Sequence, residues 1–461
     1  MIEQALRTAY LFAAPGFRVP FFFSLLLCCT VLTAGEPVDR DLFVKEFLKK
    51  ADLVRSFDEK ILSAEADVSR AKWQYFPKIS LSFGMAPFPS YTYVRPDPTS
   101  TNKEKNRGYW DKSYYIGDFG IALQAKGEIV IPIYTFGKIG NAQDAAERGV
   151  EVAKAGKDIS VLELRKEAAS FYYSYVMATD MQNILELSLE KITDAETKLD
   201  QWLYEGKEGV SQNDLIKLRI EKERLLYSMD NVATTLDTLR ALFEKVLGPG
   251  YTLKDEFMYK APFVLSLEML ESQLTGNSAY SRLLTSGLGA LESLYKFEKS
   301  NFFPNLGAMG DYRIDYTSSV QDAGYPLPSS PYNGQTGGAG IGLEFDLNIL
   351  DQVARTRKAK AEWKAMEYKA SFVKDTALLD LRRRFNELKA LDSQVEHTRK
   401  AHKLAKGWMT TEFMNYEAGM FTTRDLIDSV KAFVEQEYNL ISSMYEYNMK
   451  VEEIISFAGV E

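Results

Sequence analysis

Four stretches of this chain alternate between apolar and polar residues, and this period of two restricts the possible folds more than any other feature. In residues 305–317 the even positions are apolar or small, such as Leu306 and Ile314, while the odd positions include Asp311 and Arg313. The other three stretches cover residues 79–85, 119–133 and 339–349. Strands of about ten residues with this alternation are typical of proteins that cross an outer membrane. A soluble β-sandwich with apolar inner faces would show the same pattern, so both interpretations stay open here.

The number of strands has a consequence for assembly. Four strands cannot close a membrane barrel within one chain, because the smallest such barrels have about eight strands. If the strands span a membrane, several copies of the chain must therefore associate. The charged positions would then line a wet lumen, although ordinary solvated strand faces would carry the same residues. The predicted lumen residues are Lys126, Glu128, Asp311, Arg313, Asp315, Glu344 and Asp346.

Long helical stretches follow the strands. Residues 141–204 and 354–416 contain no proline, and their apolar residues are spaced three and four apart. Each stretch of about 60 residues would be about 90 Å long at 1.5 Å per residue, which exceeds an ordinary globular domain. A shorter helical stretch follows each of them. We therefore expect an extended coiled-coil wall.

The chain contains the same order of motifs twice. Phe76-Pro77 before the first alternating stretch is matched by Phe303-Pro304, and Asp214-Leu215-Ile216 is matched by Asp425-Leu426-Ile427. An internal duplication is the simplest explanation. We expect a leading segment of residues 1–35, a first repeat of residues 36–254 and a second repeat of residues 255–461.

The leading segment has the features of a secretory signal peptide. Arg7 and Arg18 precede a charge-free run over residues 19–35, and a charged chain follows. A single membrane anchor is the alternative, but a run of 17 residues is short for a membrane span. Both cysteines of the chain, Cys28 and Cys29, lie in this segment, so we expect an exported mature chain without cysteine.

Composition and motifs argue against several function classes. The chain has 56 basic and 64 acidic residues and a formal charge of -8, so nucleic acid is not an expected partner. The only histidines, His397 and His402, lie five residues apart on a long helix, and we interpret them as solvated surface residues. No phosphate-binding loop of the Gly-x-x-x-x-Gly-Lys type occurs. We expect no catalytic site, no cofactor and no metal.

The motifs, taken in this order and twice over, resemble the TolC-like outer-membrane efflux proteins. The resemblance is based on the two Phe-Pro pairs, on the exit from strand to helix at residues 131–137, and on the two turns that lead from glycine to Asp-Leu. The second exit departs from the family pattern, since it has Leu350-Asp351-Gln352 where a glycine is common. The resemblance assigns Pro77, Pro304 and Pro132 to the junctions between helix and strand.

The resemblance implies a mixed α and β fold in a homotrimer. Each protomer would give four strands to a twelve-stranded transmembrane β-barrel, which continues into a long periplasmic α-helical coiled-coil barrel. The trimer would be a passive exit duct in outer-membrane lipid. It would serve tripartite efflux or type I secretion, together with a periplasmic adaptor and an inner-membrane transporter of the RND or ABC type. The alternative is a structural or adhesive coiled-coil protein of the envelope that forms no channel, and an exported enzyme is a more distant alternative.

Two turns between helices, at residues 204–214 and 416–425, would form the periplasmic end. The resemblance places adaptor docking on these turns. Plain turn chemistry, with glycine ending one helix and a hydroxyl capping the next, would explain the same residues without a partner. The expected docking residues are Gly209, Val210, Ser211, Gly419, Met420 and Phe421.

The second turn also carries a predicted gate. Asp425 and Asp428 lie three residues apart at a helix start, so a trimer would place six carboxylates around one axis. The resemblance matches them to an acidic pair at the periplasmic entrance, and matches Tyr416 to a tyrosine that holds the entrance shut with Asp214 as its expected partner. The family pattern departs at residue 421, where an arginine would support closure, but Arg424 lies nearby. Aspartate in a first helical turn is also favoured by the helix dipole alone.

Overall fold

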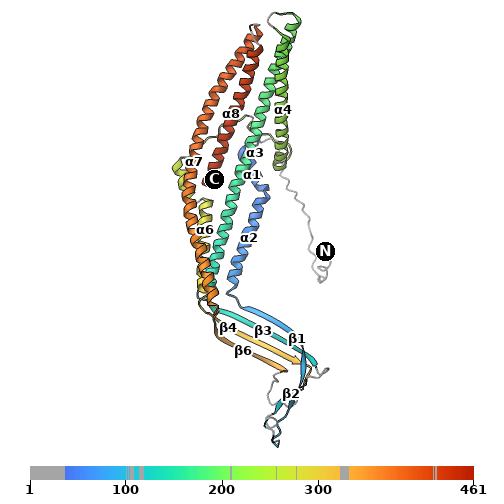
Figure 1. The fold of residues 1–461 in the computed structure, drawn as a ribbon, viewed down its shortest axis with the longest axis vertical. Helices are drawn as coiled ribbons and strands as arrows, with labels where there is room; N and C mark the ends of the chain where they lie inside the picture. The colour runs from blue at the N-terminus through green and yellow to red at the C-terminus, as the bar shows by residue number, and fades with distance from the viewer. Residues whose placement is uncertain are drawn as a thin grey trace, which may run out of the picture.

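The computed structural model describes residues 37–99, 101, 103, 108–113, 119–207, 210–255, 257–276, 278–321, 332–418, 420 and 423–460. The molecule is elongated, with a long bundle of helices at one end and a single curved sheet at the other (Figure 1). The predicted signal segment, with Cys28 and Cys29, lies outside the described residues.

The sheet is antiparallel over its four long strands. These are β1 (Lys78–Val94), β3 (Phe119–Tyr134), β4 (Asn305–Thr317) and β6 (Gly334–Glu344), paired in the order β1-β3-β4-β6. The short strands β2 (Tyr109–Ser113) and β5 (Val320–Gln321) pair with the far end of β1. Three of the four alternating stretches lie wholly in strands, as predicted. The fourth, residues 339–349, was predicted too long, because β6 ends at Glu344 and Ile349 already begins α7 (Ile349–Glu417).

The helices are as long as their periodicity predicts. The helix α3 (Lys138–Tyr204) has 67 residues and α7 (Ile349–Glu417) has 69, so each is about 100 Å long. The shorter α4 (Gln212–Leu247) and α8 (Thr423–Ala458) return beside them, as Figure 1 shows. Within the described ranges, none of the helices combines the length and the apolar character that a membrane span needs.

The two halves of the chain have the same order of elements. The first half runs through α1 (Arg40–Lys50), α2 (Asp52–Trp73), β1, β3, α3 and α4. The second runs through α5 (Leu267–Gly276), α6 (Ala279–Ser300), β4, β6, α7 and α8. This order agrees with the duplicated motifs, while the repeat limits at residues 254 and 255 stay a prediction.

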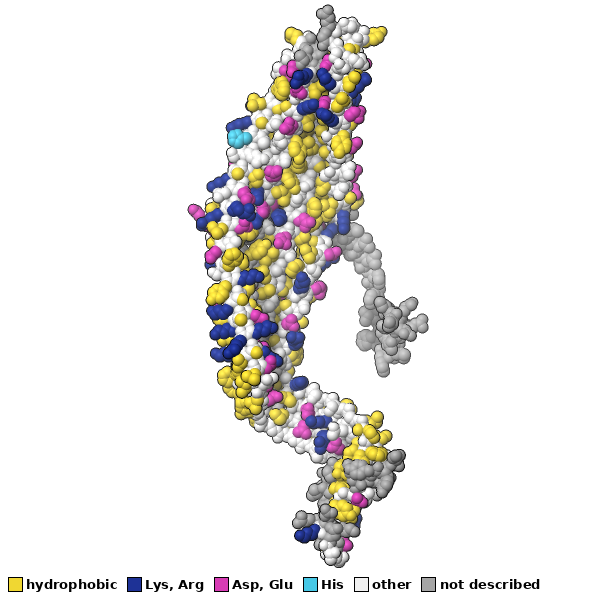
Figure 2. Space-filling view, viewed as in Figure 1, with side chains coloured by type: hydrophobic (Ala, Val, Ile, Leu, Met, Phe, Trp, Pro, Cys, Tyr) yellow, Lys and Arg dark blue, Asp and Glu magenta, His cyan; other side chains and the backbone are white. Residues whose placement is uncertain are grey.

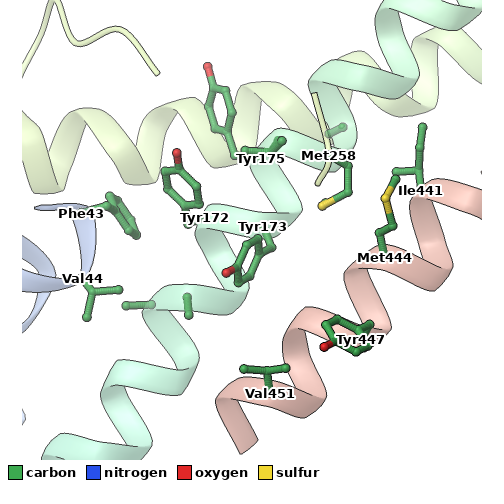
Figure 3. Close-up of a cluster of buried hydrophobic side chains, with 14 of the residues drawn as sticks. Phe43, Val44, Tyr172, Tyr173, Tyr175, Met258, Ile441, Met444, Tyr447 and Val451 are labelled. Atoms are coloured by element: carbon green, nitrogen blue, oxygen red, sulfur yellow. The ribbon is translucent and has the colours of Figure 1, made fainter. Parts of the chain in front are cut away.

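The main core, part of which is drawn in Figure 3, combines buried residues of α1, α3, α4, α7 and α8. Phe43 of α1 stacks on Phe243 of α4, with ring centroids 4.0 Å apart. Tyr172 and Tyr173 of α3 are fully buried beside them, and the Tyr172 hydroxyl donates a 2.7 Å hydrogen bond to the Asp255 carboxylate. Buried residues of α8 complete this core. Each buried aromatic or aliphatic side chain contributes about 1.5 to 3 kcal/mol to the stability of the fold. The core therefore holds both helix pairs firmly against the connection between the repeats.

A second core lies close to the two turns between helices. Leu199 of α3, Leu215 of α4 and Leu426 of α8 are buried there against Tyr416 of α7. One residue from each long helix and each returning helix thus meets in a single cluster. This packing holds the two turns next to each other.

Candidate functional site

One face of the sheet is apolar and exposed. On β1 the apolar face carries Ile79, Leu81, Phe83 and Met85, and the Phe83 side chain is 81% exposed. Leu123 of β3, Tyr316 of β4 and Ile341 of β6 belong to the same exposed face. A contiguous apolar surface of this kind marks contact with a membrane or with another protein.

The other face carries the charged residues in rows. The strand register sets Lys126 directly opposite Arg313, and sets Glu128 directly opposite Asp311. Like charges therefore face each other across the strands, while opposite charges pair along each strand. Lys126 forms an ion pair with Glu128, and Arg313 Nε lies 2.7 Å from Asp315 Oδ2. A group of acidic and basic side chains is visible on the sheet just below the helices in Figure 2.

The polar face is less charged on the two outer strands. Ser80, Ser82 and Gly84 occupy it on β1, and Thr336 and Gly338 occupy it on β6. The charges are thus concentrated on the two central strands, β3 and β4.

Two predicted lumen residues lie at the end of the sheet next to the helices. Glu344 is the last residue of β6 and faces the same side as Asp311, because it pairs with Asn305. Asp346 lies beyond the strand, in the connection to α7. Its carboxylate accepts a 3.1 Å hydrogen bond from the Asn348 N–H, and its backbone oxygen accepts one of 2.9 Å from Gln352 Nε2. Asp346 therefore shapes the connection to α7.

Both outer edges of the four-stranded sheet are open. Within the part of the chain that the structure describes, residues 78–89 of β1 pair only with β3, and β6 pairs only with β4. Each open edge presents a row of unpaired backbone N–H and C=O groups. A stable sheet with an apolar face needs a partner for these edges.

The junction between sheet and helices contains the predicted prolines. Pro77 and Pro304 directly precede β1 and β4, and Pro132 lies in β3 where the register with β4 shifts. Phe136 has a φ angle of 51°, which is unusual for a residue with a large side chain. Its ring stacks on Phe303 with centroids 5.5 Å apart, so the two repeats meet at this strained position.

The first turn between helices is built around Ser211. Its side chain caps α4 by accepting a 3.3 Å hydrogen bond from the Asp214 N–H, and its hydroxyl donates a 2.6 Å bond to the Asp214 carboxylate. This hydrogen bond, together with Lys217, lowers the pKa of Asp214 below its usual value. Val210 is half-buried against the second core, whereas Gly209 lies outside the described residues.

The second turn is held by Tyr416. Its side chain is 1% exposed and packs against Trp202 of α3, with ring centroids 5.0 Å apart. Its hydroxyl donates a 2.7 Å hydrogen bond to the backbone oxygen of Ala195, and burial raises its pKa. Within the single chain, Asp214 accepts hydrogen bonds from Ser211 and Lys217, and the expected pairing of Tyr416 with Asp214 stays a prediction.

The acidic pair is exposed at the start of α8. Asp425 and Asp428 both lie on the solvent side of this helix, because Leu426 and Ile427 between them are buried. The Arg424 Nε atom lies 3.7 Å from Asp428 Oδ2. Met420 is 73% exposed, whereas Gly419 and Phe421 lie outside the described residues. Among the described residues, no group of three or more His, Cys, Asp or Glu side chains could hold a metal ion.

Comparison with known proteins gives a consistent result for the fold. No family model matches the chain, and no curated protein matches it in sequence. Solved structures match it over nearly the whole length. They include the CmeC outer membrane channel of Campylobacter jejuni, with 13% identity, a TM-score of 0.69, and 97% of this chain and 93% of that one covered.

Two further solved structures agree. The outer membrane protein VceC of Vibrio cholerae has 12% identity and a TM-score of 0.67, with 91% of this chain and 96% of that one covered. The open state of the MtrE outer membrane channel of Neisseria gonorrhoeae has 13% identity and a TM-score of 0.65, with 91% and 88% covered. The chain has the fold of these outer-membrane channel proteins. The mixed fold expected from the resemblance is therefore confirmed for the single chain.

One buried polar group within this fold was missed from the sequence. His402 of α7 was expected to be a solvated surface residue, which is wrong, because it is half-buried and its Nε2 atom contacts the Glu437 carboxyl group of α8. Burial and the nearby Asp180 of α3 raise the pKa of Glu437 to about 7, while burial lowers the pKa of His402. His402 follows Val395 by seven residues and precedes Met409 by seven, and both of these apolar residues are buried. This heptad spacing was the sequence signal that His402 lies on the packed side of the helix.

Proposed function

We propose that three copies of this chain form an outer-membrane channel, the exit duct of a tripartite efflux or type I secretion system. The observation that carries this proposal is the four-stranded sheet, which has one apolar face, one charged face and two open edges. Three copies of four strands give twelve strands, and closing them into a barrel pairs β1 of each chain with β6 of the next. The barrel removes all open edges at once.

The two faces of the sheet then take opposite surroundings. The apolar face contacts outer-membrane lipid, and the charged rows line the lumen. The helices continue the duct into the periplasm, because every long strand joins a helix at the same end of the sheet (Figure 1). A duct of this kind is passive, so energy comes from an inner-membrane transporter of the RND or ABC type.

The turns between helices form the periplasmic end of the proposed duct. A periplasmic adaptor docks there on Val210, Ser211 and Met420, together with Gly209, Gly419 and Phe421. The gate consists of Asp425, Asp428 and Arg424 at the start of α8, and of Tyr416, which ties α7 to α3. Asp214 supports the gate indirectly, through the capped start of α4.

Cysteine pairs across the proposed seam test the barrel directly. Residues 36–461 contain no cysteine, so Ser82→Cys with Thr336→Cys adds the only pair to a chain that begins after the signal segment. In one chain β1 and β6 are separated by β3 and β4, a distance of about 14 Å at 4.8 Å per strand, which is too far for a disulfide. Oxidation should therefore link different chains and give a covalent trimer on a non-reducing gel.

A matched pair within one chain is the control. Ser80 and Glu128 are directly opposite on β1 and β3, so Ser80→Cys with Glu128→Cys should form a disulfide without linking chains. Cysteine should also be placed at the positions of β6 that neighbour residue 336, because the register between β1 of one chain and β6 of the next is set by the seam itself. If the control pair closes but every seam pair stays monomeric in outer membranes, the trimeric barrel is wrong. A protein that leaves the membrane in a carbonate wash would instead favour the structural or adhesive alternative.

A further inference from the structure

The outer end of the sheet forms a corner on its charged face. β1 pairs with β3 as far as Pro89 and then pairs with β2 and β5 from Ser90 onward. The segment after β4 folds over this corner. Ser319 fastens it there, since its hydroxyl donates a 3.0 Å hydrogen bond to the Phe88 backbone oxygen and its own backbone oxygen accepts a 3.1 Å bond from the Tyr91 N–H.

Aromatic rings make one wall of the corner. The Tyr332 ring stacks on Tyr91 with centroids 4.9 Å apart, meets Trp110 edge-on at 4.9 Å, and lies 5.8 Å from Phe88. These contacts fix the orientation of Tyr332 over the sheet. The wall is thus a packed aromatic surface supported by three different segments of the chain.

A cavity of about 490 Å³ lies between this wall and the sheet. Small residues, Gly84 and Ala86 of β1 and Ala122 of β3, leave the room for it. Its lining includes two aromatic residues, Phe88 and Tyr332, and three polar ones, Arg313, Asp315 and Gln124. Its volume is within the range of about 300 to 1,000 Å³ that is usual for small-molecule sites.

The polar side of the cavity has donors available for a ligand. The Asp315 carboxylate is already compensated, because Gln124 Nε2 donates a 2.9 Å hydrogen bond to it and Arg313 forms an ion pair with it. Within the part of the chain that the structure describes, Arg313 meets Asp315 at ion-pair distance through Nε, but this buried Nε atom has no hydrogen-bond partner. Lys126 lies directly opposite Arg313 on the same face, where its charge is paired with Glu128. The cavity therefore combines an aromatic surface with a guanidinium that can still donate.

From this geometry we propose that the cavity is a contact site for planar aromatic solutes that carry a carboxylate, close to the outer exit of the duct. The ring packs against Phe88 and Tyr332, and the carboxylate accepts hydrogen bonds from Arg313. The inference rests on the channel function proposed above, which places this face in the lumen. The proposed site would make the duct prefer certain solutes, and this preference would arise in the barrel, far from the periplasmic turns.

The test uses single channels of the full trimer in planar bilayers, with 2-naphthoate added on the extracellular side. Each binding event should interrupt the current briefly, since a solute on the lumen wall narrows the path. Arg313→Gln should shorten the interruptions at least fivefold, and so should Phe88→Ala combined with Tyr332→Ala. Arg313→Lys and Tyr332→Phe, which keep the charge and the ring, should retain most of the effect.

Two matched solutes separate the contributions. Cyclohexanecarboxylate lacks the aromatic ring and 2-naphthalenemethanol lacks the charge, so both should interrupt the current less than 2-naphthoate. Equal interruption by all three solutes, or no change in Arg313→Gln channels that still run as trimers, would overturn the site while leaving the channel intact. Absence of any channel current from the correctly folded trimer would instead overturn the proposed function itself.

Discussion

The Tyr416 hydroxyl donates a 2.7 Å hydrogen bond to the backbone oxygen of Ala195, a residue 221 positions earlier in the chain. This bond joins the last turn of α7 to the C-terminal part of α3, next to the two turns between helices. Opening the proposed entrance requires the helix pairs to move apart, so this contact opposes opening.

Tyr416→Phe should therefore open the channel more often. The ring stays packed against Trp202, and only one hydrogen bond is lost, which costs about 0.5 to 1.5 kcal/mol. Single-channel conductance and open time in planar bilayers measure the effect, and Tyr438→Phe, at a half-exposed position of α8, is the matched control. Unchanged gating in Tyr416→Phe would show that this bond is only structural.

The second prediction concerns the acidic pair. Asp425 and Asp428 are exposed on one side of the first turn of α8, and a trimer would bring six such carboxylates to one axis. Crowded carboxylates attract cations and bind polyvalent ones, so a trivalent cation on the periplasmic side should block the current. Asp425→Asn with Asp428→Asn should relieve this block and reduce the cation preference. The control is Asp237→Asn, which removes an exposed negative charge from a different helix, α4. It should leave the block and the cation preference unchanged.

The third prediction tests which face of the sheet meets lipid. Ser82 and Phe83 are neighbours in the middle of β1 and point to opposite faces. Phe83→Arg should destabilise the barrel by about 2 to 4 kcal/mol near the membrane midplane, whereas Ser82→Arg should mainly change the conductance. Urea unfolding from lipid vesicles measures the first effect and bilayer recording the second. The reverse order of the two effects would assign the faces the other way round.

The sequence predicted those features that depend on short-range periodicity. Alternation over residues 305–317 places Asp311, Arg313 and Asp315 on one face of the sheet, because the period of a strand is two wherever it pairs. The long helices followed from apolar spacing in the same way. Contacts between distant segments did not follow, since they depend on how the helix pairs pack. The bond from Tyr416 to Ala195 is one case.

β1 shows the same limit within a single strand. Its alternating part predicted residues 79–85, but the strand continues to Val94 because its last residues pair with β2 and β5. The partner β2 is separated from β1 by a loop, and the partner β5 is separated from it by most of the first repeat. His402 is a similar case, since its burial depends on α8 lying against α7.

The last prediction follows from the pair of His402 and Glu437. Their ordinary pKa values are 6.5 and 4.5, whereas in the folded chain the pKa of Glu437 is about 7 and that of His402 is lowered. Where the pH lies below 6.5 but above the lowered pKa of His402, the unfolded pair holds one proton on the histidine and the folded pair holds one on the glutamate, so these two groups leave stability nearly constant. Above pH 6.5 the unfolded pair loses its proton first, so stability should fall as the pH rises towards 7.

Glu437→Gln should remove this alkaline loss, because the variant has no proton to release from the folded pair near pH 7. The remaining His402, whose pKa is lowered by burial and then by Lys406, makes stability rise with pH up to about 6.5 and stay constant above it. Urea unfolding of the trimer at pH 5.5, 6.5 and 7.5 distinguishes these profiles, and His397→Asn, at an exposed position of the same helix, should reproduce the parent profile. If Glu437→Gln instead keeps the loss above pH 6.5, the proton is held by another group, and Asp180, which is 5% exposed and has its own pKa raised by burial, would be the next position to substitute.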